Sequence, residues 1–254
     1  FNDAKDLWGK DNIETNAPIK ESLADKKVQV ASIGLSGEKI SFMSGITTDD
    51  GRIAARSGLG AVMGSKKLKA VSFRGTQDIP IADKAGTKAI TKKFLADYKK
   101  SKGGDRFTLK IMGFLSKVIA RTGLAVPASA SVVRELYKKY GTPGLTVISG
   151  MTGDTPIKNW TGVGYTDFTY DKLQNIGGDK VISNQKKKYA CQNCPLGCGG
   201  MLDIKKGRYA GTKGHKPEYE AWGAFGSMML IDDYDAIVEM NEMCNRAGID
   251  SIST

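Results

Sequence analysis

The sequence predicts an α+β protein in which the end of a β-rich domain is followed by a mainly α-helical domain. Residues 1–75 contain short runs in which apolar and polar residues alternate, as is typical of strands. After Pro80, apolar residues recur at spacings of three and four, as is typical of amphipathic helices. At 254 residues, 40% of them hydrophobic, the chain can bury one large core or two smaller ones. We expect two domains, 1–78 and 79–254.

The N-terminal region is predicted to contain a short helix and two strands. Residues 6–24 have the pattern of a short helix that follows a loop. Residues 27–34 and 69–75 each alternate and end at a glycine, which indicates a strand that ends in a turn.

A glycine-rich segment lies between the two predicted strands. Residues 51–66 join Arg52 and Arg56 to the run Gly58-Leu-Gly60-Ala-Val-Met-Gly64. Small residues let backbone amides approach a ligand closely, and a guanidinium can bind a phosphate or carboxylate through two hydrogen bonds. The segment is neither a P-loop nor a dinucleotide fingerprint. The segment therefore fits a ligand-binding loop and a tightly packed glycine-rich helix equally well.

The C-terminal region is predicted to be helical, with one long loop over 142–178, which is rich in Gly, Thr and Tyr. The last helix has Asp233 as its candidate N-cap and Gly248 at the position of a C′ glycine. The four predicted helices are 83–100, 107–122, 129–140 and 233–247.

The chain is basic, with a formal net charge of +11 and a pI near 9.4. Its lysines form short clusters at 66–69, 186–188 and 205–206, without the arginines, interleaved aromatics or motifs of nucleic-acid-binding modules. The clusters are either solvated faces or a docking surface for an acidic partner such as a small ferredoxin. We expect no nucleic-acid partner. We also expect no membrane span, because no run approaches the roughly 20 apolar residues needed to cross a bilayer.

Both ends of the chain suggest a piece of a longer polypeptide. The chain starts at Phe1 rather than at an initiator Met, and no charged-then-apolar signal pattern follows. We therefore expect an internal segment of a larger protein.

Three of the four cysteines lie within eight residues, as Cys191-Gln-Asn-Cys194-Pro-Leu-Gly-Cys198. Thiolates this close together rarely form a disulfide framework, and Gly197 and the following glycines would let the backbone curve around a metal centre. An iron–sulfur cluster, a structural zinc ion and redox-active thiols all fit this spacing. The loop itself supplies no fourth ligand.

Cys244 is the remaining thiol, and a count of cysteines alone would make it the fourth ligand of the metal centre. It belongs to an apolar stripe at helical spacing, which favours a place in the core. The stripe consists of Ala236, Ile237, Met240, Met243 and Cys244.

Four segments together resemble the aldehyde:ferredoxin oxidoreductase family. They are the run 58–71, the cysteine loop, Pro217-Glu218-Tyr219-Glu220, and the run 244–254. The resemblance covers nearly the whole chain and is weakest between about 100 and 180. Members of this family carry tungsten, or sometimes molybdenum, held by two pterin dithiolenes beside a [4Fe-4S] cluster. The resemblance implies that this cofactor lies at the interface of the two domains, and that a further C-terminal domain lies outside this chain.

The resemblance also implies cofactor-binding roles for individual residues. Cys191, Cys194 and Cys198 match three cluster ligands, and the fourth would lie outside this segment. The stretch 245–250 matches a pterin-binding Asp-x-x-Gly-Leu-Asp motif, with Asn in place of the first acid. An asparagine still donates and accepts hydrogen bonds but cannot place a carboxylate there. The cofactor-binding candidates are Arg52, the backbone carbonyl of Ile53, Arg56, Asn245, Gly248 and Asp250, with a magnesium ion bridging the pterin phosphates near Arg52 and Ile53.

Three residues are catalytic candidates. Glu220 matches an acid close to the metal in the family. Glu239 matches a second acid near the cofactor, although it aligns with Asp235, Glu242 and Arg246 on a helix face that would ordinarily be solvated. His215 is the only histidine; it lies in a predicted flexible loop and is either a surface residue or a proton carrier.

The resemblance implies an oxidoreductase that converts aldehydes to carboxylic acids and passes electrons to a ferredoxin or an iron–sulfur subunit. It also implies an oligomer or multi-subunit complex in an anaerobic cytoplasm. An alternative within the family is the catalytic subunit of an aromatic acyl-CoA (benzoyl-CoA type) reductase. A third reading is a non-catalytic metal-binding interaction module. The sequence does not identify the substrate or choose between tungsten and molybdenum.

Overall fold

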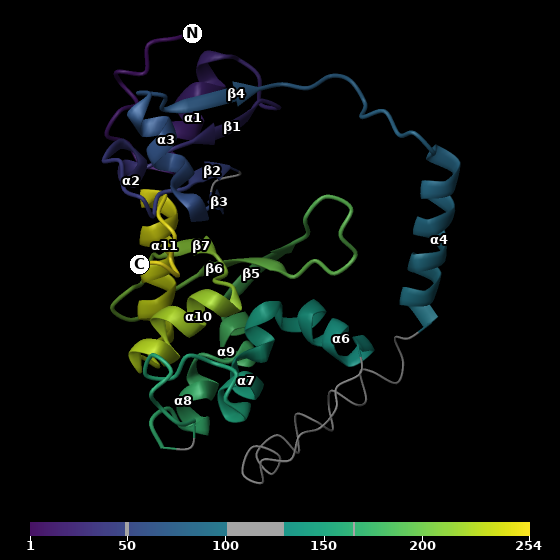
Figure 1. Cartoon of the computed structure of the whole chain (residues 1–254), viewed down its shortest axis with the longest axis vertical. Helices are drawn as coiled ribbons and strands as arrows, with labels where there is room; N and C mark the ends of the chain where they lie inside the picture. The colour runs from purple at the N-terminus through teal and green to yellow at the C-terminus, as the bar shows by residue number, and fades with distance from the viewer. Residues whose placement is uncertain (49–50, 101–129, 165) are drawn as a thin grey trace. The chain divides into compact units, whose positions relative to one another are not determined.

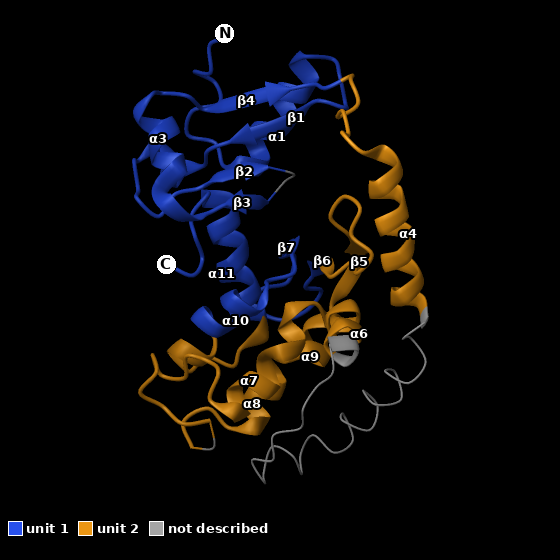
Figure 2. Ribbon diagram, turned by 45° about the vertical axis from the view of Figure 1, so that its right-hand side comes forward, with its two compact units in different colours: residues 1–75, 202–225, 235–254 blue, residues 76–201, 226–234 orange. Residues whose placement is uncertain are grey.

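The structure is a computed structural model that describes residues 1–48, 51–100, 130–164 and 166–254 (Figure 1). Its residues form two compact units, each assembled from separate stretches of the chain (Figure 2). Unit 1 comprises Phe1–Gly75, Leu202–Phe225 and Asp235–Thr254, and unit 2 comprises Thr76–Met201 and Gly226–Tyr234. The mixture of helices and strands confirms the predicted α+β class. The domain division at residue 78 stays a prediction.

Unit 1 contains a four-stranded sheet of order β3-β2-β1-β4, in which every neighbouring pair is antiparallel. The strands are β1 (Gln29–Ser32), β2 (Ile46–Thr48), β3 (Arg52–Ala54) and β4 (Ala70–Phe73). The two strands predicted from alternation are confirmed as β1 and β4. Strands β2 and β3 carry no separate signal in the sequence, because three residues are too few to establish a period of two.

Helix α1 (Asn12–Ser22) begins at a capping box formed by Asp11 and Glu14. The Asp11 carboxylate accepts hydrogen bonds from the backbone N–H groups of Ile13 and Glu14, both at 2.8 Å. The Glu14 carboxylate in turn accepts the Asp11 N–H at 3.1 Å. The helix is shorter than the predicted 6–24 because this cap fixes its first residue at Asn12.

The glycine-rich run 58–64 forms a tightly packed helix, which was one of the two structures predicted for this segment. Helices α2 (Leu35–Glu38) and α3 (Leu59–Ser65) pack so closely that a Cβ on Gly64 would lie 1.9 Å from the Gly37 carbonyl oxygen. Only glycine permits that approach. A short 3₁₀ turn, η1 (Arg56–Gly58), precedes α3 and carries Arg56.

The C-terminal part of unit 1 holds β7 (Lys213–His215), α10 (Tyr219–Phe225) and most of α11 (Tyr234–Ala247). Helix α11 confirms the prediction over 233–247, and Gly248 follows it with a φ of 70°, the left-handed conformation expected of a C′ glycine. Ile237 and Cys244 of the predicted stripe are buried, whereas Met243 is exposed. Cys244 is therefore a core residue, and its burial raises the pKa of its thiol.

Unit 2 is mainly helical. The predicted helices 83–100 and 129–140 are confirmed as α4 (Lys84–Lys100) and α6 (Ala130–Tyr140), and the predicted helix 107–122 lies outside the described residues. Three short helices follow α6 and pack around Phe168, Leu173, Ile176 and Val181, all of which are fully buried. They are α7 (Thr146–Thr152), α8 (Tyr170–Asn175) and α9 (Gly178–Ser183). The 3₁₀ turn η2 (Thr142–Leu145) directly precedes α7, and a second one, η3 (Ser227–Met229), comes later in the chain.

The prediction of one long loop over 142–178 was wrong, because η2, α7 and α8 lie within it. Their glycines and threonines have low helix propensity, so the segment carries little local helical signal. These helices are stabilised by tertiary packing. Gly150 of α7 lies directly against the Leu173 side chain of α8, since a Cβ added to Gly150 would come within 2.4 Å of it.

A second sheet has the order β5-β6-β7. Strand β5 (Gln185–Tyr189) and strand β6 (Gly199–Asp203) flank the loop that holds Cys191, Cys194 and Cys198. Across the helices of the described residues, none has the length and apolar character needed to pass through a bilayer.

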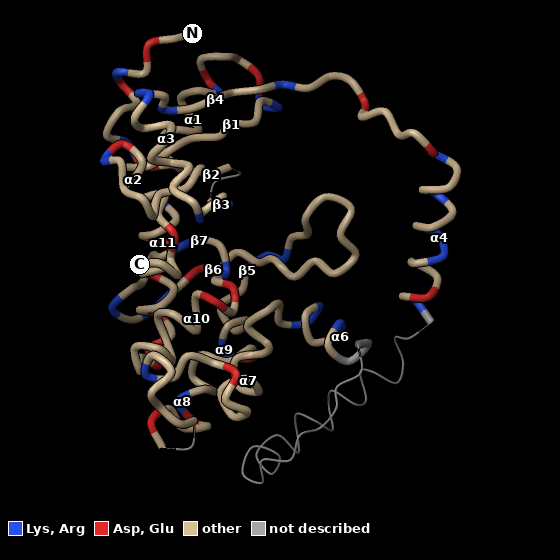
Figure 3. The backbone as a smooth tube through the Cα atoms, viewed as in Figure 1, with Lys and Arg blue, Asp and Glu red and all other residues tan. Residues whose placement is uncertain are grey.

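The lysine clusters are mostly exposed. Figure 3 shows where lysines and arginines lie along the backbone. Lys66 and Lys67 are exposed, and so are the clusters at 186–188 and 205–206. Lys69 is the exception, since only 1% of it is exposed. The reading of 66–69 as a solvated cluster was therefore wrong at this residue.

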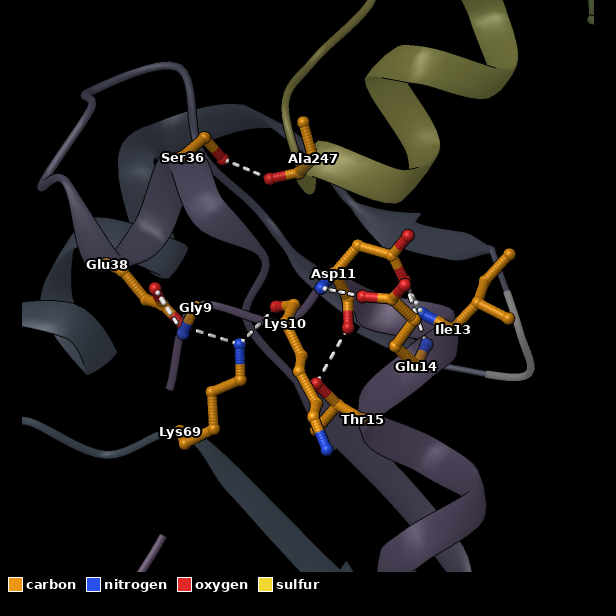
Figure 4. Close-up of polar contacts among 10 residues, drawn as sticks. All are labelled: Gly9, Lys10, Asp11, Ile13, Glu14, Thr15, Ser36, Glu38, Lys69 and Ala247. Carbon is orange, nitrogen blue, oxygen red and sulfur yellow. Dashed lines mark hydrogen bonds and ion pairs between the residues drawn. The ribbon is translucent and has the colours of Figure 1, made fainter. Parts of the chain in front are cut away.

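The buried Lys69 contacts two other parts of unit 1, the end of α2 and the segment before α1 (Figure 4). Its ammonium lies 2.6 Å from a carboxylate oxygen of Glu38 at the end of α2 and donates to the Lys10 carbonyl at 2.7 Å. The same Glu38 carboxylate accepts the Gly9 N–H at 3.0 Å through each of its oxygens. This buried ion pair fixes the segment that leads directly into Asp11.

Candidate functional site

The segment 245–250, which the resemblance assigned to pterin binding, spans the end of α11 and is built into the N-terminal part of unit 1. The Gly248 carbonyl accepts hydrogen bonds from the Gly45 N–H and the Ser36 hydroxyl, both at 2.8 Å. Two residues later, the Asp250 N–H donates to the Met43 carbonyl at 2.9 Å. The backbone of the motif is therefore held by residues roughly two hundred positions earlier in the chain.

The N-terminal side of the motif is held in the same way. The Asn12 amide donates to the Asn245 carbonyl at 2.8 Å and to the Thr47 hydroxyl at 2.6 Å. Gly34 lies so near the end of α11 that a Cβ there would come within 2.4 Å of the Ala247 carbonyl oxygen. Asn245 is thus fixed through its backbone, and its side chain is half-buried.

The structure brings two of the predicted cofactor-binding residues together. The Arg56 guanidinium lies 3.4 Å from the Asp250 carboxylate, with Asp250 buried and the Arg56 side chain 65% exposed. The carboxylate also accepts the N–H groups of Ile252 at 3.4 Å and Ser253 at 3.2 Å, which fixes its direction. An oriented acid beside an exposed guanidinium fits a ligand that presents both hydrogen-bond donors and an anionic group.

Arg52 and Ile53 lie on β3, and both are half-buried. Ile53 pairs with Thr47 of β2 in the sheet register. Gly51, immediately before Arg52, adopts a φ of 140°. These residues lie in the same unit as the 245–250 motif.

His215 lies at the end of β7, so the prediction of a flexible loop was wrong at this residue. Its ring lies against Gly51, where a Cβ would come within 2.7 Å of the ring. The structure therefore places the only histidine of the chain beside the segment that carries Arg52.

Glu239 is half-buried on α11 and accepts a hydrogen bond from the Thr212 hydroxyl. The expectation that its helix face would be solvated was wrong, because Glu242 on the same face is only 7% exposed. Glu220, by contrast, is exposed in the first turn of α10, and so is Glu218 just before the helix.

Asp11, Glu242 and Arg246 form a charged cluster that sequence reasoning did not find. The Arg246 guanidinium lies 2.7 Å from the Asp11 carboxylate and 3.2 Å from that of Glu242. Burial raises the pKa of Glu242 to about 7, although Arg246 and Asn245 favour its charged form. Asp11, with Glu242, raises the pKa of Arg246. The spacing of Glu242 and Arg246 by four residues was visible in the sequence, but Asp11 lies 235 residues away and carried no such signal.

Cys191 is exposed, and Cys194 and Cys198 are half-buried. The Cys194 N–H donates to the Cys191 carbonyl at 3.0 Å, which closes a turn. Asn193 and Gly197, the residues directly before Cys194 and Cys198, both have a φ of 60°. Left-handed residues turn successive N–H groups toward one side of a loop, as in the backbone nests of many iron–sulfur sites. The expected curvature at Gly197 is present, and Asn193 adds a second bend that the sequence did not reveal.

The donor set of this loop fits a soft metal centre, since thiolates are the ligands that iron–sulfur clusters and zinc prefer. Among the residues that the structure describes, no group of three His, Cys, Asp or Glu side chains is already gathered as a metal site. Lys188 lies near the loop, and its pKa is lowered by burial and by the Lys138 ammonium, while the Cys198 sulfur opposes this effect.

Comparison with known proteins places these features in a family. Residues 1–75 match the family model "Aldehyde ferredoxin oxidoreductase, N-terminal domain", and residues 118–254 match "Aldehyde ferredoxin oxidoreductase, domains 2 & 3". The two matches together define a chain of an oxidoreductase family. The chain belongs to the aldehyde ferredoxin oxidoreductase family.

Among the relatives is a tungsten-containing aldehyde ferredoxin oxidoreductase of Thermococcus kodakarensis, 35% identical over 253 residues. Another, of Pyrococcus furiosus and of the same description, is 34% identical over 252 residues. A more distant relative, the WOR-like subunit of an aliphatic sulfonate oxidoreductase from Pyrococcus furiosus, is 25% identical. The alignments cover 99% of this chain and 36% to 37% of these relatives, so the chain spans little more than a third of their length.

The fold also resembles a solved structure, the active-site complex BamBC of benzoyl coenzyme A reductase with 1,5-dienoyl-CoA. The match has a TM-score of 0.69 and covers 98% of this chain and 34% of that one. Sequence identity is 23%, so the likeness concerns the fold alone.

Proposed function

We propose that the complete protein is a tungsten- or molybdenum-containing bis-pterin oxidoreductase that oxidises aldehydes to carboxylic acids. A [4Fe-4S] cluster would carry the electrons to a ferredoxin or an iron–sulfur subunit. The observation that carries this proposal is the pairing of Arg56 with Asp250, two residues that the resemblance independently assigned to cofactor binding. The relatives at 34% and 35% identity, named as tungsten-containing enzymes, support the choice of cofactor.

The residues of this chain would divide the work of binding between two places. Arg52 and Arg56 would bind the pterin phosphates, and the Ile53 carbonyl would help to hold the bridging magnesium. Asp250 and Asn245 would accept and donate hydrogen bonds at the pterin rings, on a backbone that Gly45, Ser36 and Met43 hold in place. Cys191, Cys194 and Cys198 would supply three of the four cluster ligands. Their backbone bends at Asn193 and Gly197 suit a cluster held in a curved loop.

Oxidation of an aldehyde to an acid adds an oxygen atom from water and releases two electrons and two protons. The metal pterin, when bound, would accept both electrons, and the cluster would pass them on singly. Glu220 would accept a proton from the attacking water, since its carboxylate is exposed at the start of α10 and free to meet a substrate. Glu239 is held by the Thr212 hydroxyl and His215 by its packing against Gly51, and we assign both to proton transfer beside the cofactor.

Reduction of an aromatic acyl-CoA thioester is the second candidate. It is favoured by the fold match to benzoyl coenzyme A reductase, which extends over 98% of this chain. The higher identity to aldehyde ferredoxin oxidoreductases supports aldehyde oxidation as the first candidate. Low-potential tungsten chemistry and reduced cluster thiolates would suit an anaerobic cytoplasm. The complete protein would work there as part of an oligomer or a larger complex.

Two measurements on the complete protein test this proposal. Metal analysis should find iron together with tungsten or molybdenum; iron alone would indicate an electron carrier, and zinc alone a structural module. A substrate panel should then give reduction of an oxidised dye with aldehydes, and no oxidation of a reduced dye with aromatic acyl-CoA esters. Turnover of the esters alone would assign the second function instead.

A further inference from the structure

Position 245 is where this chain departs from the motif that the resemblance assigned to pterin binding, because Asn245 stands in place of the first acid. A carboxylate only accepts hydrogen bonds, whereas an amide both accepts and donates. An amide therefore reproduces a carboxylate contact only if it is held in one orientation. The Asn245 backbone is fixed, since its carbonyl accepts from the Asn12 amide at 2.8 Å. The orientation of its side chain depends on a neighbouring side chain.

A buried carboxylate lies three residues before Asn245 on the same face of α11. Residues three apart on a helix are neighbours, and the Asn245 amide donates a hydrogen bond to the Glu242 carboxylate. Glu242 is buried, and β7 covers it so closely that a Cβ added to Gly214 would lie 2.0 Å from a carboxylate oxygen. The Glu242 side chain therefore has little freedom to move away from Asn245.

Arg246 and Asp11 hold the Glu242 carboxylate in this position. The Arg246 Nε donates to a Glu242 oxygen at 3.2 Å, and its Nη1 donates to an Asp11 oxygen at 2.7 Å. Asp11 is itself fixed, because its other carboxylate oxygen caps α1. Among the described residues, Arg246 and Asp11 are the charged groups that act on Glu242, and β7 faces it with the backbone of Gly214. The cluster therefore presents Glu242 to Asn245 in one arrangement.

We propose that Glu242 is a positioning residue that compensates for the missing first acid of the motif. Its carboxylate holds the Nδ2 of the Asn245 amide, which leaves the Oδ1 as the atom presented to the pterin. Asn245 then meets the ligand as a hydrogen-bond acceptor, as a carboxylate at this position would. The inference rests on the proposed function and adds to it the way in which one pterin contact is made.

The positioning effect requires a charged Glu242. A carboxylate only accepts, but a protonated carboxyl group also donates, so it no longer restricts the amide to one orientation. Burial raises the pKa of Glu242 to about 7. The group is therefore mainly charged at about pH 8.5 and mainly protonated at about pH 5.5. A glutamine resembles the protonated carboxyl group at either pH, because its amide also both donates and accepts.

The rate at which the complete protein releases its pterin tests the inference, with the released pterin oxidised and measured by its fluorescence. At about pH 8.5, Glu242→Gln should release the pterin about fivefold faster than the unaltered protein, the effect of about one hydrogen bond. At about pH 5.5 the two rates should agree within about twofold. A merely structural role predicts the opposite trend, because removal of the buried carboxylate stabilises the fold more as the pH rises.

Two further variants separate positioning from packing. Asn245→Asp/Glu242→Gln returns the carboxylate to position 245, where the N–H groups of the glutamine can donate to it. At about pH 8.5, this double variant should release the pterin within about twofold of the rate of the unaltered protein. The matched control is Met243→Gln, which introduces the same residue at the exposed neighbouring position of α11 and should leave the rate unchanged.

Three results would overturn the inference. They are equal release from Glu242→Gln and the unaltered protein at about pH 8.5, the same ratio of the two rates at both pH values, and no rescue in Asn245→Asp/Glu242→Gln. An unaltered protein that contains no pterin would reject the proposed function, on which the inference depends. Because release is measured without turnover, a pterin-containing protein that oxidises no aldehyde would retain the positioning role of Glu242 and lose the proposed reaction.

Discussion

Replacing Glu242 by glutamine tests the consequences of burying a carboxylate in the cluster with Asp11 and Arg246. Burial raises the pKa of Glu242 from its ordinary value of 4.5 to about 7. The folded protein therefore binds this proton more tightly than the unfolded chain does. The free energy of unfolding should fall as the pH rises from about 4.5 to about 7, because the carboxylate must then be charged inside the fold. At about 1.36 kcal/mol for each pKa unit, the full effect is about 3 kcal/mol.

Glu242→Gln should remove this pH dependence without breaking the cluster. The glutamine side chain can still accept from the Arg246 guanidinium, which now lies 3.2 Å from Glu242. Arg246 also keeps its 2.7 Å contact with Asp11, so no charge is left buried and unpaired. Relative to the parent, the variant should gain about 3 kcal/mol of unfolding free energy on going from about pH 5 to about pH 8.

The assay is equilibrium denaturation of parent and variant at these two pH values. Met243→Gln is the control, since it introduces the same residue at the exposed neighbouring position of α11 and removes no titratable group. If the free energy of unfolding of Glu242→Gln differs from that of the parent by the same amount at both pH values, the reasoning is refuted. The carboxylate would then not be held in a desolvated site.

Three further predictions concern the cluster, the catalytic acid and the buried ion pair. Cys194→Ser in the complete protein should remove most of the iron and the EPR signal of the cluster, and an unchanged signal would reject the ligand assignment. Glu220→Gln should lower turnover by about 10²–10⁴ with the tungsten content retained; if turnover survives there and is lost in Glu218→Gln, the base is Glu218. Lys69→Met should cost about 3–5 kcal/mol of stability, because Glu38 is left buried without its cation. Most of this should return in Lys69→Met/Glu38→Gln, and a further loss in the double variant would show that the pair is not coupled.

The sequence predicted the parts of this protein whose signal is local. The end of α11 is an example, because a left-handed glycine at the C′ position follows from Gly248 alone. The curvature at Gly197 in the cysteine loop is another, because glycine adopts the left-handed conformation without steric cost. The metal centre itself stays a prediction. The long helices α4 and α6 were found by their periodicity. The short helices in 142–178 were missed, because they depend on packing such as that of Gly150 against Leu173.

Taken alone, the sequence determined the family resemblance, the fold class and the candidate residues, because motif spacing and periodicity are properties of neighbouring positions. Tertiary structure decided which of these residues meet and which are buried. It joined Arg56 to Asp250 and Asp11 to Arg246, and it buried Lys69 and Glu242, which read as solvated in the sequence. Burial depends on which distant segments cover a residue. A charge enters the interior only where such a segment supplies its partner, as Glu38 does for Lys69.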